Sequence, residues 1–266
     1  MTGREVGPTF AREGGPVRYR ARVEYDGTEF DGFQDQPGRR TVQGELEAAL
    51  ARLSDRRGVR VAAAGRTDAG VHAAGQVIAF TYPGRLPAGE LERALAAILP
   101  ADIGVRGLRR APPGFHPRHA ARYREYRYTV WNGPRSPLHE RFALGVREPL
   151  DVAAMAEAAS ALVGRHDFSA FGVTDRQPIR TLHWVRIRRT GHQVTIDVAA
   201  DAFLRQMVRS IVAALLLAGR GEVARGEIVE ALGSGARAFH GAVAPPHGLC
   251  LRRVVYRRAG TTDGEG

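Results

Sequence analysis

Strict alternation of apolar and polar residues opens the regular part of the chain, over residues 17–25. A period of two places one set of side chains on each face of a β-strand, so this segment is predicted to be a strand with one buried face. Its apolar face carries Val17, Tyr19, Ala21, Val23 and Tyr25. Comparable segments predict strands at residues 59–64, 75–82, 103–110, 121–131, 180–189, 192–200 and 248–257.

Apolar residues at helical spacing predict the helices. In residues 42–54 they recur at intervals of three and four behind Thr41, a residue type that caps helix N-termini well. A helix over residues 151–163 begins after Asp151 for the same reason and ends at Gly164. Further helices are predicted at residues 88–99, 204–218 and 225–232.

The order of these elements predicts an α+β fold. The first half is predicted to run β-α-β-β-α-β, and the order partly recurs from residue 121. Alternating strands are typical of antiparallel sheets with one solvated face. We therefore expect two similar ferredoxin-like, split β-α-β halves that share a mostly antiparallel sheet, with helices on one face and an active-site cleft between the halves.

Prolines and glycines suggest where the halves meet. Pro112, Pro113, Gly114 and Pro117 interrupt the chain before the second set of elements. The predicted domains are residues 17–118 and 119–258. Residues 1–16 and 259–266 lack periodicity and are predicted to be flexible tails.

Charge points to a polyanionic partner. The 266-residue chain contains no lysine, and its 39 arginines against 28 acidic residues give a net charge of +11. A GC-rich genome would explain the choice of arginine but not the excess of positive charge. Nucleic acid is therefore the favoured partner. The absence of lysine excludes a phosphate-binding loop ending in Gly-Lys, a lysine Schiff base and a pyridoxal-phosphate anchor.

Other compositional features narrow the class further. The sequence contains no run of about 20 apolar residues, the length needed to span a bilayer. The charged, glycine-containing N-terminus is unlike a secretory signal, so a cytoplasmic location is expected. A single cysteine, Cys250, allows no internal disulfide and no multi-cysteine zinc or iron–sulfur site.

One loop combines a carboxylate with small residues. Between two predicted strands, Asp68 lies near Arg66 and is flanked by Gly65 and Gly70, which leave room for a bulky substrate to approach. Asp before Gly is more often a local hydrogen-bond acceptor in a surface turn. The spacing alone therefore leaves a catalytic role as the less common alternative.

Several motifs together resemble the tRNA pseudouridine synthase A family. The most diagnostic is GRTDAGVHA at 65–73, and the companions follow in the family's order over about residues 17–258. They are YDGTEFDGFQDQ at 25–36, TVQGELEAAL at 41–50, FHPRHAARYREYRY at 115–128, DFSAF at 167–171, DAFLRQMVRSIV at 201–212 and GLCLRRVVY at 248–256. Phe33 stands where the family usually has Trp, which bears on aromatic packing or an RNA contact. Asp201 stands where Asn is usual.

The resemblance implies an activity and a catalytic set. It implies isomerisation of uridine to pseudouridine at positions 38, 39 and 40 of tRNA, without metal or cofactor. Asp68 would be the essential carboxylate, as a nucleophile at C1′ or as the base that removes a sugar proton. Tyr126 would stack on the flipped base and is the candidate base for the C5 proton, and Arg209 would pair with Asp68. From the residues alone, a core aromatic is the favoured interpretation of Tyr126, and Arg209 could be a solvated arginine on an amphipathic helix.

Further residues are expected to bind substrate. The resemblance makes Arg66 the side chain that fills the space left by the flipped nucleotide, although a phosphate contact is nearly as plausible. Phe33 and His72 complete the expected substrate-binding set, with His72 interpreted as packing or positioning. His116 and His119 lack a carboxylate or cysteine that would complete a metal site, so RNA or structural contact is favoured.

The expected partners are tRNA and a second copy of the chain. Arginines on predicted strands could lie along a tRNA backbone, although each could also belong to a solvated face. They are Arg18, Arg20, Arg22, Arg118, Arg122, Arg124, Arg186, Arg188 and Arg189. The family's pattern implies a homodimer. Two alternatives stay open: a non-catalytic protein that binds structured RNA, and a uracil methyltransferase using Cys250, although that cysteine lies in an alternating strand and is better explained as core.

Overall fold

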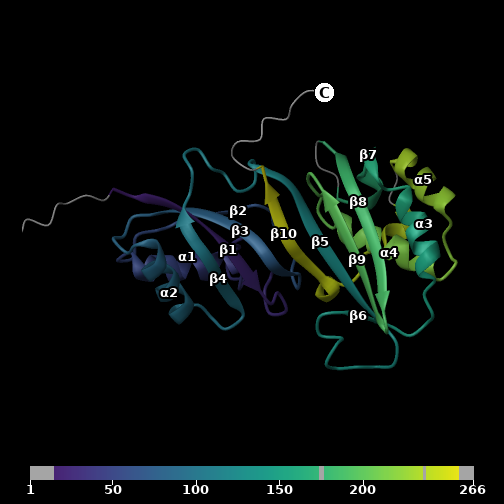
Figure 1. The fold of residues 1–266 in the computed structure, drawn as a ribbon, viewed down its shortest axis with the longest axis horizontal. Coiled ribbons are helices and arrows are strands. Elements are labelled where there is room, and N and C mark those ends of the chain that lie inside the picture. Colours follow the sequence, from purple (N-terminus) through teal and green to yellow (C-terminus); the bar gives the residue numbers. More distant parts are fainter. Residues whose placement is uncertain (1–14, 174–176, 236–237, 258–266) are drawn as a thin grey trace, which may run out of the picture.

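A computed structural model describes residues 15–173, 177–235 and 238–257 (Figure 1). The two predicted tails therefore lie almost wholly outside the described residues. The strands are β1 (Val17–Tyr25), β2 (Val61–Ala63), β3 (His72–Tyr82), β4 (Ile103–Arg110), β5 (Ala121–Asn132), β6 (Leu144–Val146), β7 (Gly164–Asp167), β8 (Ile179–Thr190), β9 (Gln193–Ala200) and β10 (Leu249–Tyr256). The α-helices are α1 (Val42–Leu53), α2 (Ala88–Ile98), α3 (Val152–Ser160), α4 (Met207–Gly219) and α5 (Arg225–Ser234).

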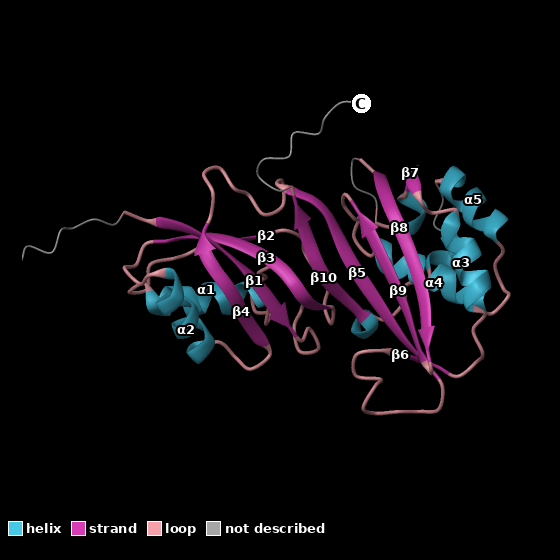
Figure 2. Cartoon of the chain, in the orientation of Figure 1, coloured by secondary structure: helices cyan, strands magenta, loops and turns pink. Residues whose placement is uncertain are grey.

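One mixed sheet of ten strands runs through the described residues, as expected for an α+β fold (Figure 2). Its order is β4-β1-β3-β10-β5-β9-β8-β7, with β2 paired to β3 and β6 to β5. Only the β10–β3 and β5–β6 pairs are parallel, and all the others are antiparallel. The sheet is therefore mostly antiparallel.

The C-terminal strand joins the two halves of this sheet. β10 pairs with β3 of the first half through Cys250 and Leu251, and with β5 of the second half over most of its length. The last strand in the sequence thus lies at the centre of the sheet. The division between residues 118 and 119 stays a prediction.

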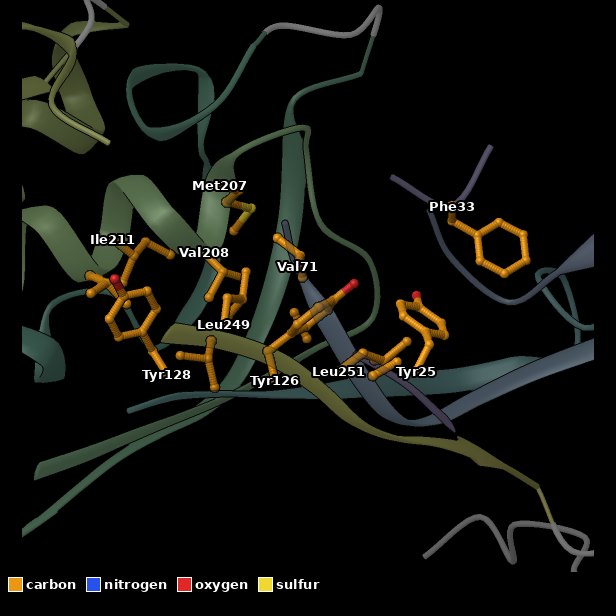
Figure 3. Close-up of a cluster of buried hydrophobic side chains, with 14 of the residues drawn as sticks. Tyr25, Phe33, Val71, Tyr126, Tyr128, Met207, Val208, Ile211, Leu249 and Leu251 are labelled. Atoms are coloured by element: carbon orange, nitrogen blue, oxygen red, sulfur yellow. The ribbon is translucent and has the colours of Figure 1, made fainter. Parts of the chain in front are cut away.

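Helices cover the face that carries the aromatic residues. Cross-strand partners point to the same side of a sheet, and the register links Tyr25 to Ala73, Ala73 to Leu251, and Leu251 to Tyr126. Side chains of α4, among them Val208 and Ile211, pack beside the tyrosines of β5 on this face (Figure 3). At the other end, the Tyr82 hydroxyl donates to the backbone oxygen of the last residue of α1. The opposite face carries the arginines of β1, of which Arg22 is exposed and Arg18 and Arg20 are partly buried.

Element boundaries differ from the prediction in a few places. β6 and β7 were not predicted, because strands of three and four residues are too short to show a period. α3 ends at Ser160 rather than 163, and β3 starts at His72 rather than 75. Helix caps were predicted well: the side chains of Thr41 and Asp151 accept backbone N–H bonds at the starts of α1 and α3. No helix in the described residues has the length and apolarity needed to cross a membrane.

Candidate active site

The loop with Asp68 is fixed by backbone contacts to residues 26–33. It joins β2 to β3, and the Thr67 oxygen accepts from the N–H of Phe33 at 3.1 Å. Gly32 has a φ of +93°, and a Cβ there would lie 2.8 Å from the Thr67 oxygen. Only glycine therefore permits this approach at the required conformation. The Gly70 N–H donates to the Phe30 oxygen at 3.2 Å and holds the other end of the loop.

Asp68 meets an arginine from the second half of the chain. The Arg209 Nη1 lies 3.4 Å from Asp68 Oδ2, although the two residues are 141 positions apart. The Asp68 side chain is 31% exposed and that of Arg209 14% exposed, so the carboxylate stays accessible while the guanidinium is mostly buried. Asp68 is thus neither buried nor on a free surface turn, and it has the charged neighbour that the family pattern implied.

Arg209 is held by a segment that links it to the rest of the site. Its Nε donates to the Ala244 oxygen at 2.7 Å, and the Ala244 N–H donates back to the Arg209 oxygen at 3.1 Å. The Tyr128 hydroxyl donates to the next carbonyl, that of Pro245, at 2.9 Å. Residues 244–248, which we name the strap, therefore connect α4 to β5.

Sequence reasoning did not assign a role to the strap. Its Pro246 reaches the Asp68 loop, because a Cβ on Gly70 would lie 2.9 Å from Pro246 Cγ. Pro246 also lines a cavity of about 390 Å³ beside the loop, together with Thr28, Glu29, Phe30, Asp31, Ala69 and Gly70. The consecutive prolines at 245 and 246 were a visible signal for a rigid segment, but nothing local connects them to Asp68.

His72 ties the strap to the first half of the chain. Its Nδ1 accepts from the Gly27 N–H at 2.9 Å, and its Nε2 lies 3.1 Å from the His247 oxygen. Accepting at Nδ1 leaves Nε2 as the donor, which fits the carbonyl partner. Burial lowers the pKa of His72, so the imidazole is held neutral. The side chain is only 8% exposed. These contacts suit the positioning role expected for His72, which stays a prediction.

Two tyrosines lie beneath the loop on the helix-covered face. Tyr126 is 8% exposed, and the Phe203 ring packs edge-on to it at a centroid distance of 5.1 Å. Burial raises the pKa of the Tyr126 phenol, and the neighbouring Tyr25 and Asp68 act in the same direction, so the phenol is protonated at neutral pH. The Tyr25 hydroxyl is hydrogen-bonded to Thr67 Oγ1 at 2.8 Å and adds a further tie to the loop. Figure 3 shows Tyr126 between Tyr25 and the side chains of α4.

The remaining expected substrate contacts lie in different settings. Arg66 is exposed on the loop and makes no hydrogen bond or ion pair within the part of the chain that the structure describes. It is free to meet a ligand. Phe33 is 2% exposed and its ring lies 6.3 Å from that of Tyr25. The Phe33 ring thus packs against an aromatic neighbour, and its contact with substrate stays a prediction.

Arg124 differs most from its predicted setting. We expected a surface arginine, but it is 8% exposed. Its guanidinium donates to the backbone oxygens of Ala64, Asp201 and Arg118. The shortest bond to each oxygen is 2.6–2.8 Å long. Ala64 immediately precedes the Asp68 loop, so Arg124 anchors the loop to β5. Strand parity was the missed signal, because Arg124 alternates in phase with the buried Tyr126 and Tyr128.

Candidate ligands for a metal do not gather in the described residues. The rings of His116 and His119 lie 4.3 Å apart, but no group of three or more His, Cys, Asp or Glu that could hold an ion occurs there. Cys250 is half-buried, and burial raises the pKa of its thiol. A thiol in this environment is a weak nucleophile.

Comparison with known proteins identifies the family. The tRNA pseudouridine synthase family profile matches residues 21–119 and 158–257. Three relatives carry the description tRNA pseudouridine synthase A. That of Geobacter sulfurreducens is 43% identical and spans 88% of this chain and 97% of its own length. Those of Methylococcus capsulatus and Frankia casuarinae are 42% and 44% identical, over 90% and 91% of this chain and 90% of their own lengths. The chain therefore belongs to the tRNA pseudouridine synthase family.

Proposed function

We propose that this protein isomerises uridine to pseudouridine at positions 38, 39 and 40 in the anticodon stem and loop of tRNA. The observation that carries the proposal is an ion pair at 3.4 Å between Asp68, in the loop that bears the family's motif, and Arg209 of α4. The carboxylate is partly exposed and paired with a mostly buried arginine, whereas an ordinary turn residue would face open solvent. Family membership supports the reaction and its tRNA substrate.

The chemistry needs one well-placed carboxylate and one proton acceptor. The N1–C1′ bond breaks, the uracil turns, C5 bonds to C1′, N1 gains a proton and C5 loses one. No electrons or groups are exchanged with another molecule. Asp68 either attacks C1′ as a nucleophile or removes a sugar proton, and both routes remain open. Arg209 orients the carboxylate for either route.

Other residues are proposed to act on the flipped nucleotide. Tyr126 stacks on the base and is the candidate acceptor of the C5 proton, a role that requires its phenol first to give up its own proton. The neighbouring Phe203 has to move aside to expose the ring. Arg66 fills the space left in the RNA stack, which suits its planar guanidinium and its lack of a polar partner among the described residues. His72 positions the strap and hence Arg209. We further propose that the protein acts in the cytoplasm as a homodimer.

Two other functions are less well supported. A non-catalytic RNA-binding protein would share the basic surface but would not need Asp68 beside Arg209. A uracil methyltransferase would need Cys250 as a nucleophile, and burial of that thiol disfavours the thiolate. A Cys250→Ser variant that keeps its activity would dismiss the second alternative.

The decisive experiment measures release of tritium from tRNA labelled at uracil C5. The native protein should release label to water, and Asp68→Asn should abolish release while changing tRNA affinity by less than about tenfold, or 1.4 kcal/mol. Asp55→Asn is the matched control, because Asp55 is a highly exposed carboxylate and should keep full activity. Binding of tRNA without any release by the native protein would contradict the proposal.

A further inference from the structure

The sheet face opposite the active site contains a second concave site. A cavity of about 270 Å³ lies over β5, β8, β9 and β10. Its lining consists of Glu125, Arg127, Trp184, Arg186, Arg188, Asp197, Arg252 and Arg253, which we name the arginine groove. Glu125 and Arg127 alternate with Tyr126, and Arg127 pairs in register with Asp197. The groove is therefore on the side away from Tyr126.

Two of the arginines in the groove form ion pairs with its two carboxylates. Arg127 makes two bonds to Asp197, at 2.7 and 2.9 Å, and Arg253 lies 2.6 Å from Glu125. The Asp197 and Glu125 side chains are only 10% and 12% exposed. The acids are thus covered, and the groove presents mainly guanidinium groups to the solvent.

The other three arginines of the groove are less engaged and can bind an anion. Arg186 and Arg252 are exposed and form no ion pair within the described chain. Arg188 lies 3.8 Å from Asp197, which already has two bonds to Arg127. The Cζ atom of Arg186 lies over the Trp184 ring, 4.3 Å from its centroid, and this cation–π contact restricts the position of the guanidinium. A stacked guanidinium keeps its outward edge for a bidentate contact with phosphate.

Basic residues extend the same face into the first half of the chain. Arg22 pairs in register with Arg106, and both are exposed. Arg22 alternates with the buried Val23, so it points away from the helix-covered face. This arrangement suits a long polyanion better than a single small anion. Two copies of so basic a surface would repel each other if they met face to face.

We propose that the arginine groove binds backbone phosphates of RNA, as a contact separate from the Asp68 site. The inference rests on the proposed RNA substrate, and it assigns that partner a second surface. Contacts to phosphate position an RNA without reading its sequence. The groove therefore contributes affinity and orientation, whereas Asp68 and its neighbours perform the reaction.

The test compares two double variants of equal charge. Arg186→Gln with Arg188→Gln removes two groove cations. Arg52→Gln with Arg93→Gln removes two exposed arginines from α1 and α2, which belong to the helix-covered side. Binding of tRNA is measured against salt concentration, in the Asp68→Asn background so that no reaction intervenes. A plot of the logarithm of the binding constant against the logarithm of salt concentration has a slope set by the number of phosphate contacts. Each lost contact should reduce this slope by about 0.9, the coefficient for duplex DNA, which we apply to duplex RNA.

The expected results separate the possible occupants. The groove variant should weaken binding at least tenfold at about 0.1 M salt and flatten the slope by close to 2, and the control should do neither. Equal slopes and affinities in the two variants would overturn the proposal. So would a groove variant that changes the sedimentation of the free protein but not its RNA binding, because the groove would then be a contact between copies. Failure of tritium release by the native protein would remove the proposed reaction but leave these binding results intact.

Discussion

At the residue scale, the site depends on side chains whose neutral or charged form is fixed by their surroundings. His72 illustrates this, because both ring nitrogens have partners and the ring is nearly inaccessible. The Asp26 Oδ1 also lies 3.1 Å from the His72 Nδ1. The lone pair of Nδ1, however, already accepts a hydrogen bond from the Gly27 N–H. Protonation of Nδ1 would break the bond from Gly27 and exchange it for an ion pair with Asp26. The Gly27 contact therefore favours the neutral ring.

This environment predicts a dependence of stability on acid. Burial lowers the pKa of folded His72 below the ordinary value of 6.5, so the unfolded chain binds the proton first. Stability should therefore fall as the pH drops below about 6.5, by at most about 1.4 kcal/mol per pH unit from this group. His72→Gln lacks the titration and should lose less stability over the same range. Urea unfolding midpoints between pH 5 and 7.5 check this, and parallel curves for the two proteins would contradict it.

At the element scale, pattern and capping predicted most of the structure. The nine-residue alternation of β1 and the capped periods of α1 and α3 are local signals, and the structure confirms them. β7 is four residues long and owes its existence to its pairing with β8, which local sequence does not encode. The contact between Asp68 and Arg209 was available only through the family resemblance. The strap was missed because its contacts to Tyr128 and His72 join segments more than 100 residues apart.

Arg124 shows how one strand residue can position a loop. Removing its guanidinium by Arg124→Met leaves the carbonyls of Ala64, Asp201 and Arg118 without this donor, and each such loss costs about 1–3 kcal/mol when buried. We expect at least 2 kcal/mol lower stability by this estimate. The turnover rate should fall more than KM rises, because the Asp68 loop loses its anchor.

The matched control for this prediction is Arg122→Met, which replaces an exposed arginine two residues away on the same strand. It should change the free energy of unfolding by less than about 0.5 kcal/mol. Urea unfolding and single-turnover tritium release measure the two effects. Equal behaviour of the Arg122 and Arg124 variants would show that burial of Arg124 has no positioning consequence.

At the scale of the whole molecule, the sheet makes the two halves one structural unit. β10 lies between β3 and β5, and its Leu251 is fully buried at the point where the register joins Ala73 to Tyr126. Asp68 and Arg209 come from opposite sides of this junction. Their relative position therefore depends on β10 as much as on the loops that carry them.

Truncation of Leu251 should consequently weaken both halves. Leu251→Ala is expected to cost about 2–5 kcal/mol, as for other buried leucines. If the sheet unfolds as one unit, amide hydrogen exchange in β1 and in β9 should accelerate by the same factor, because both strands then exchange through the same opening. Leu91→Ala, a fully buried leucine of α2 within the first half, provides the comparison. It should accelerate exchange in β9 as well as in β1. Faster exchange confined to β1 in that variant, or unchanged exchange in β1 after Leu251→Ala, would show that the halves open independently and that β10 does not couple the two parts of the active site.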